Sequence, residues 1–154
     1  MKWTCCYLIV QKFTFYTYTL QSTRAKFSRN TIQPYCKLCK ESDETIEHFL
    51  LDCISLSDAR QRYMEKLFKI LREIEGGGTI DVINDGLLLE FILDCSALDL
   101  LSNQPIEKLL DIERETQDLC YHLHMKRTKL LCKTIGQQYI KVHNTSCQKN
   151  NFTG

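Results

Sequence analysis

The chain has 154 residues, of which 44% are hydrophobic and 25% charged, values that are ordinary for a globular protein. No stretch approaches the ~18 consecutive apolar residues of a membrane-spanning helix. The apolar run near the start is too short for a secretory signal, so we expect an intracellular protein of the nucleus or cytoplasm. Nine cysteines, an odd number, exclude a framework in which every cysteine is paired within the chain.

The net charge of +1 conceals an uneven distribution of charge along the chain. The first forty residues contain seven basic residues and no acidic one. All nineteen acidic residues lie between Glu41 and Asp118, together with seven basic residues, and the last six basic residues follow without an acid. The basic N-terminal part is therefore where we expect a polyanion to bind.

The predicted elements of the N-terminal half are helical. Residues 1–18 are a lead-in of unassigned structure, and residues 19–75 are expected to form a zinc-binding helical module that begins with a short basic helix over 19–30. Ser42 or Asp43 is expected to cap the next helix, and Ser55 or Ser57 to open a longer one. The glycines at 76–78 predict a linker.

The C-terminal half is also expected to be mainly α. Residues 79–136 form a second helical region, a helical pair or hairpin, although the apolar run at 87–93 is also compatible with a buried strand. Ser102 and Pro105 are expected at the start of a last helix, whose apolar stripe extends over more than about 25 residues. The polar composition of residues 137–154 predicts a disordered tail.

The motif that carries chemistry is C-x2-C-x8-H-x4-C, formed by Cys36, Cys39, His48 and Cys53. Three cysteines and one histidine are a standard ligand set for Zn²⁺, and four protein ligands leave no open coordination position for a substrate. The motif therefore predicts a structural zinc site, and we expect a binding module that is not an enzyme. The alternative is a set of ordinary buried thiols beside a surface histidine.

The spacing of the last two ligands imposes a geometric condition. On an ideal α-helix, Cys53 would lie about 140° around the axis from His48. Both side chains can reach one ion only if the helix ends or distorts near Asp52. We also expect a carboxylate or a carbonyl to orient the second ring nitrogen of His48. His122 and His124 are two residues apart on a predicted helix, so they point to different faces and cannot hold one metal together.

Exposed cations and an aromatic residue surround the motif. The residues expected to contact nucleic acid are Arg24, Lys26, Phe27, Arg29, Lys37 and Lys40. The cations suit phosphate groups, whereas Phe27 and the nearby Tyr35 suit stacking with bases. The alternative is that these cations only keep the surface soluble.

The same segment resembles a known family. The run from Thr19 to Phe27, the two cysteines at 36 and 39, the stretch Glu44-Thr-Ile-Glu-His-Phe-Leu-Leu-x-Cys53 and Arg60 are similar to the zinc-binding segment that follows the reverse transcriptase domain of non-LTR retrotransposons. The resemblance covers about residues 20–71 and is weaker over 106–131. It implies zinc binding by the four ligands and a grip on RNA or target DNA. No polymerase, endonuclease or RNase H carboxylate pattern accompanies it.

Two functions are consistent with these features. The first is a zinc-dependent module that binds RNA or DNA without polymerase activity of its own. The second is a zinc-stapled structural or protein-interaction module, in which the acidic helices predicted over 56–75 and 105–131 meet a protein partner. Neither hypothesis involves a membrane or a small-molecule substrate.

Overall fold

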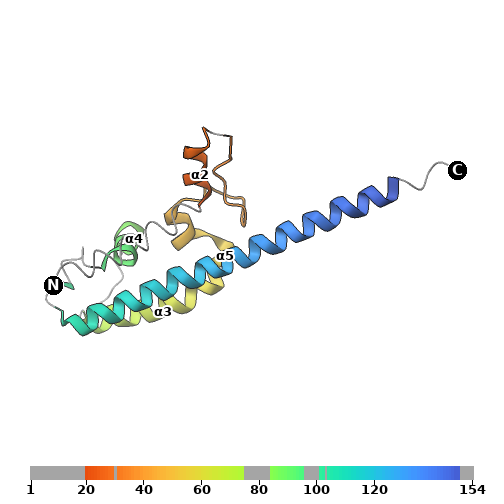
Figure 1. Cartoon of the computed structure of the whole chain (residues 1–154). Coiled ribbons are helices and arrows are strands. Elements are labelled where there is room, and N and C mark those ends of the chain that lie inside the picture. Colours follow the sequence, from red (N-terminus) through yellow and green to blue (C-terminus); the bar gives the residue numbers. More distant parts are fainter. Residues whose placement is uncertain (1–19, 30, 75–83, 96–100, 103, 150–154) are drawn as a thin grey trace.

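The computed structural model describes residues 20–29, 31–74, 84–95, 101–102 and 104–149, with the backbone alone described from residue 135 onwards. Within these ranges every regular element is a helix, and Tyr35 and Asp43 form an isolated β-bridge. The elements are α2 (Gln21–Phe27), η1 (His48–Asp52), η2 (Ile54–Leu56), α3 (Ser57–Ile74), α4 (Asp85–Leu93) and α5 (Ile106–Lys149) (Figure 1). The predicted mainly α fold is confirmed. Residues 1–18 and the predicted linker at 76–78 lie outside the described residues.

Helices α3 and α5 lie side by side and form the main packing interface of the molecule (Figure 1). Their buried positions recur every three or four residues, as expected for two amphipathic helices in contact. The buried side chains at this interface are Tyr63, Leu67 and Leu71 of α3 and Ile112, Leu119, Cys120 and Leu123 of α5. Each fully buried leucine or isoleucine contributes about 1.5–3 kcal/mol. None of the described helices is long and apolar enough to cross a membrane.

The apolar run at 87–93 forms helix α4, and the alternative of a buried strand is not observed. The side chain of Asn84 accepts a hydrogen bond from the amide of Leu87 at 2.9 Å, which caps the first turn. Phe91 and Ile92 are completely buried, whereas Leu87 is exposed. One face of the run therefore joins the core, and the helical spacing turns the rest outward.

The last helix is longer than the sequence predicts. It begins directly after Pro105 and extends for 44 residues, through positions 137–149, for which the composition predicts a disordered tail. After Pro105 the helix contains no further proline and a single glycine, Gly136, so no residue type within it strongly opposes helical backbone. In Figure 1 its C-terminal part projects beyond the other elements.

A buried ion pair connects the N-terminal segment to α5. Arg127 donates from Nε to Oε1 of Glu44 at 2.7 Å and from Nη2 to Oε2 at 2.8 Å, so the contact is bidentate. Both side chains are almost completely buried, at 6% and 2% exposure. Glu44 Oε2 also accepts from the amide of Gln21 at the start of α2. One carboxylate therefore holds three parts of the chain together, α2, the segment before η1, and α5.

Breaking this ion pair should be costly. We expect Arg127→Met to lower the free energy of unfolding by about 3–5 kcal/mol, because it leaves the carboxylate of Glu44 buried without a cation. Urea unfolding followed by circular dichroism measures the change. The matched control is Lys126→Met, which removes the exposed ion pair with Asp58 and should change stability little. Equal effects of the two substitutions would contradict this account of Arg127.

Candidate metal centre

The first two ligands lie on a tight turn closed by backbone hydrogen bonds. The amide of Cys36 donates to the carbonyl of Ser42 at 2.8 Å, and the amide of Glu44 donates to the carbonyl of Pro34 at 2.8 Å. Inside this hairpin, the amide of Lys40 donates to the carbonyl of Cys36 at 2.9 Å. Lys40 has a φ of 63°, in the left-handed region, and this conformation reverses the chain after Cys39. The turn aims both sulfurs in one direction.

The other two ligands lie at the ends of a π-helical turn. Thr45 Oγ1 accepts from the amide of His48 at 3.1 Å and caps the turn, so the prediction that Ser42 or Asp43 is the cap was wrong. The amide of Cys53 donates to the carbonyl of His48 at 2.7 Å, five residues back. This i→i+5 bond widens the turn and brings residues five apart onto one face. It is the distortion near Asp52 that the spacing of the ligands requires.

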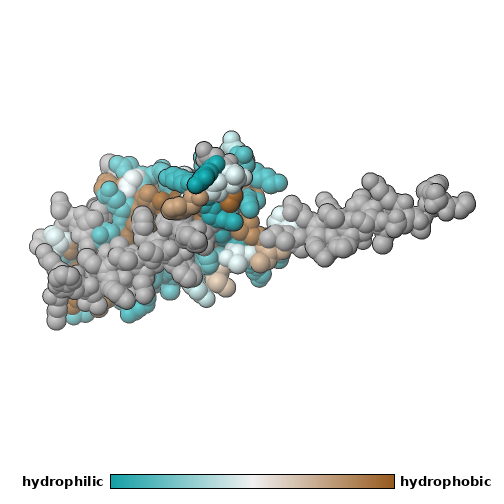
Figure 2. All heavy atoms as spheres, turned by 45° about the horizontal axis from the view of Figure 1, so that its top comes forward, coloured by the Kyte–Doolittle hydropathy of each residue, from teal (hydrophilic) through white to brown (hydrophobic). Residues whose placement is uncertain are grey.

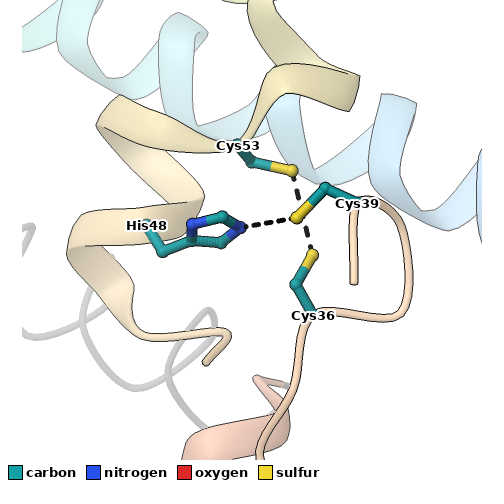
Figure 3. Close-up of side chains that lie close together, drawn as sticks. All are labelled: Cys36, Cys39, His48 and Cys53. Carbon is teal, nitrogen blue, oxygen red and sulfur yellow. Dashed lines mark hydrogen bonds between the residues drawn. The ribbon is translucent and has the colours of Figure 1, made fainter. Parts of the chain in front are cut away.

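The four side chains converge on one point. Their ligand atoms all lie within 4.8 Å of one another, and Figure 3 shows the three sulfurs and the imidazole nitrogen facing a common centre. Cys36 Sγ lies 3.8 Å from Cys53 Sγ, and Cys39 Sγ lies 3.3 Å from His48 Nε2. All three cysteines are free thiols, and Cys36 and Cys53 are buried. This cluster can hold a metal ion.

The charges at the cluster favour a bound cation. The hydrogen bond from the Cys53 thiol lowers the pKa of Cys36 to about 4, because it stabilises the Cys36 thiolate. The same contact raises the pKa of Cys53, so that this thiol keeps its proton. A metal ion would replace that proton and deprotonate the thiols that it binds. Because protons and metal compete for the same atoms, affinity for metal should fall as the pH falls.

A hydroxyl group orients the histidine. His48 Nδ1 lies 2.8 Å from Ser42 Oγ, while Nε2 faces the sulfurs. For Nε2 to act as a ligand, Nδ1 must carry the ring proton and donate it to Ser42. The predicted carboxylate or carbonyl is therefore replaced by a serine hydroxyl. The sequence gives no signal for this contact, because Ser42 belongs to the turn and not to the helix of His48.

Arg60 supports the π-helical turn from the adjacent helix α3. Its Nε donates to the carbonyl of Leu50 at 2.6 Å, and its Nη2 donates to the carbonyl of Cys53 at 3.0 Å. These carbonyls lie at the end of a turn, where helical partners are missing. Burial lowers the pKa of Arg60, and its electrostatic interactions with Cys53 and Asp52 oppose that shift. The guanidinium thus donates hydrogen bonds to carbonyls at the end of the turn and places a positive charge beside the thiol cluster.

The predicted nucleic-acid contacts are all exposed. Arg24, Lys26 and Phe27 belong to α2, Arg29 follows it, and Lys37 and Lys40 belong to the cysteine turn. Phe27 is 79% exposed, which is unusual for a phenylalanine. These residues share the segment that carries the metal ligands but contribute no ligand atom. Whether they bind nucleic acid stays a prediction.

Substitution of the cysteine turn tests the site. We expect Cys36→Ser combined with Cys39→Ser to abolish metal binding and to unfold residues 20–56, because the energy of metal binding is also folding energy in a small metal-dependent segment. Native mass spectrometry measures the metal content, and proteolysis measures the local unfolding. Cys132→Ser, at an exposed thiol outside the cluster, is the control and should keep the metal. One equivalent of metal in the double variant would refute the assignment.

Removal of the Ser42 hydroxyl tests the orientation of His48. We expect Ser42→Ala to weaken metal affinity by about 10–100-fold, as is typical when a group that orients a histidine ligand is lost. Competition with a chromophoric chelator measures this affinity. Ser57→Ala is the matched control, because the Ser57 hydroxyl bonds to the carbonyl of Ile54 and not to a ligand. Unchanged affinity in Ser42→Ala would show that the hydroxyl is dispensable.

Comparison with known proteins gives no family for the chain. No protein-family model, no curated protein sequence and no solved structure matches it. The function is therefore inferred from the group of three cysteines and one histidine.

Proposed function

We propose that this chain is a zinc-dependent module that binds single-stranded or double-stranded nucleic acid. The observation that carries the proposal is the cluster of three cysteine sulfurs and one imidazole nitrogen within 4.8 Å. A tetrahedral zinc ion with Zn–S bonds of about 2.3 Å separates its sulfur ligands by about 3.8 Å. The distance between Cys36 Sγ and Cys53 Sγ is 3.8 Å.

The donor set favours zinc over other common metal ions. Thiolates are soft ligands, which Mg²⁺ and Ca²⁺ avoid, whereas a tetrahedral set of sulfur and imidazole donors is typical of zinc. Four protein donors complete the tetrahedron, so the ion would have no position for a reactive water. With three thiolates the bound site would keep one negative charge, and the buried guanidinium of Arg60 lies close enough to offset it. In this proposal zinc stabilises the segment and takes no part in catalysis.

The surface around the site supports binding to a polyanion. Arg24, Lys26 and Lys37 are exposed, and Phe27 and Tyr35 are exposed at 79% and 56% beside them. Cations can contact phosphates, and exposed aromatic rings can stack on bases without much choice of sequence. In Figure 2, where the top of Figure 1 comes forward, hydrophilic residues lie around a central group of hydrophobic ones on this side.

The resemblance to retrotransposon reverse transcriptases indicates a biological role for the proposed module. In it, the chain corresponds to the zinc-binding part that follows the polymerase domain, and it helps to hold RNA or target DNA. Two residues of the resembling segment have defined contacts here, since Glu44 pairs with Arg127 and Arg60 holds the turn of Cys53. The proposed relationship to this family rests on the four-ligand motif and on the positions of Glu44 and Arg60.

A protein-interaction module is the second candidate. Ile106 and Leu110 lie one turn apart on α5 and are 57% and 52% exposed. The apolar faces of α3 and α5 are used against each other, so a protein partner would meet this edge and the charged outer surfaces. In that case zinc would stabilise the fold and nucleic acid would not bind.

Charge reversal separates the two candidates. We expect Arg24→Glu, Lys26→Glu and Arg29→Glu together to weaken binding to single-stranded RNA or DNA by about tenfold or more, because phosphate contacts dominate such affinity. Fluorescence anisotropy of the zinc-loaded protein at low and physiological salt measures the loss. The matched control reverses three exposed cations elsewhere, Lys69, Arg72 and Lys108, with the same change in net charge. An equal loss in the control, or binding that does not depend on salt, would count against the proposed surface.

A further inference from the structure

A cleft between α3 and α5 lies apart from the metal ligands. Its volume is about 360 Å³, within the range of roughly 300–1,000 Å³ that is usual for ligand sites. Residues on two successive turns of each helix line it: Asp58, Ala59, Arg62 and Tyr63 from α3, and His122, Met125, Lys126 and Lys129 from α5. The sequence does not predict it, because α3 and α5 are distant in the chain.

The side chains that line the cleft carry a net positive charge. Three of the lining residues are cations and one is an acid. Lys126 pairs with Asp58 at 3.0 Å, and this contact lowers the pKa of Asp58. Arg62 and Lys129 have no ion-pair partner among the described residues, so two cations on opposite walls remain available for an anion.

Two stacked rings, one from each helix, are among the side chains that line the cleft. The rings of Tyr63 and His122 are stacked, with centroids 4.9 Å apart and an interplanar angle of 30°. His122 Nδ1 lies 2.8 Å from the carbonyl oxygen of Asp118 and donates to it, which fixes the orientation of the imidazole. Tyr121 packs edge-on against His122 at 5.4 Å and is 52% exposed. The imidazole is thus held rigidly at the surface, next to the cations.

We infer that this cleft is a second contact point for single-stranded nucleic acid, with Arg62 and Lys129 on a phosphate and the His122 ring against a base. The inference rests on the proposed function and extends it to a surface that contains none of the residues around the cysteine turn. Cations alone would suit any polyanion. The combination of cations on both walls with a fixed, exposed aromatic group is the pattern of sites that bind a phosphate and its base together.

The connection between the two surfaces favours their acting on one strand. Asp58, at one edge of the cleft, follows the metal ligand Cys53 by five residues, through the single turn of η2. On α5, Arg127 is the neighbour of Lys126 and is held by Glu44 of the metal-binding segment. Both helices of the cleft are therefore anchored directly to that segment. Two contact points held in this way increase the affinity for a strand that reaches both.

An NMR titration tests the inference directly. The zinc-loaded protein, labelled with ¹⁵N, is titrated with single-stranded oligouridine and oligothymidine, and the amide signals of Arg62, Tyr63, His122 and Lys126 are followed together with those of Arg24, Lys26 and Phe27. Movement of both sets supports the cleft as a second contact. Movement of the α2 set alone overturns the cleft and leaves the proposed function standing. Movement of the cleft set alone supports the cleft and overturns the α2 surface, and no movement overturns both.

Variants then separate the two chemical roles within the cleft. We expect Arg62→Glu with Lys129→Glu to weaken binding and to reduce the slope of log K against log salt by about 0.7, since the two cations share one phosphate and each lost phosphate contact on a single strand accounts for about 0.7. His122→Ala should weaken binding with the slope unchanged, because stacking releases no counterions. The control, Lys69→Glu with Lys108→Glu, reverses one exposed cation on each of the same two helices. A control that matches the cleft variant in affinity and slope would overturn the assignment.

Discussion

Three cysteine sulfurs and an imidazole nitrogen lie within 4.8 Å of one another, and thiolates at such distances repel one another unless a cation lies between them. The fold brings these four groups together through local backbone geometry on both sides of the site. A reversed turn at Lys40 presents two sulfurs, and the i→i+5 hydrogen bond from Cys53 to His48 presents the other two donors. Both are unusual backbone conformations, and each is supported by contacts from outside its own turn.

Those supporting contacts extend the influence of the site through the molecule. Arg60 of α3 holds the carbonyls at the end of the π-helical turn, and Glu44 joins the segment between the ligands to α2 and to Arg127 of α5. Buried ion pairs add little stability compared with apolar contacts of the same shape, but they are expensive to separate. The Glu44–Arg127 pair therefore fixes which part of α5 meets the segment that contains the four candidate ligands.

The sequence predicts the parts of this arrangement that depend on short spacings. The four ligands were identified from their intervals, the interruption of the helix near Asp52 followed from the five-residue step, and the helices α3 and α5 followed from their apolar periodicity. The partner of His48 was not predicted, because a serine in a turn has many possible contacts. Glu44 belongs to the stretch that carries the family resemblance, but its ion pair is not predicted, since its partner Arg127 is 83 residues away. The cleft between α3 and α5 is not predicted either, because the residues that line it are far apart in the sequence.

The length of helix α5 has a consequence for how the chain would respond to a change at the candidate metal site. Its 44 residues extend for about 66 Å, and the docked part ends near the residues that contact Glu44 and α3. Starting a helix in water is unfavourable, whereas lengthening an existing one is nearly neutral for each added residue. The docked turns thus act as a template from which the projecting turns grow. Glu44 lies between the candidate ligands, so a change at Cys36, Cys39, His48 and Cys53 could loosen its ion pair with Arg127. The projecting turns of α5 would then lose the docked helix from which they extend, and helical order would fall several nanometres from the site.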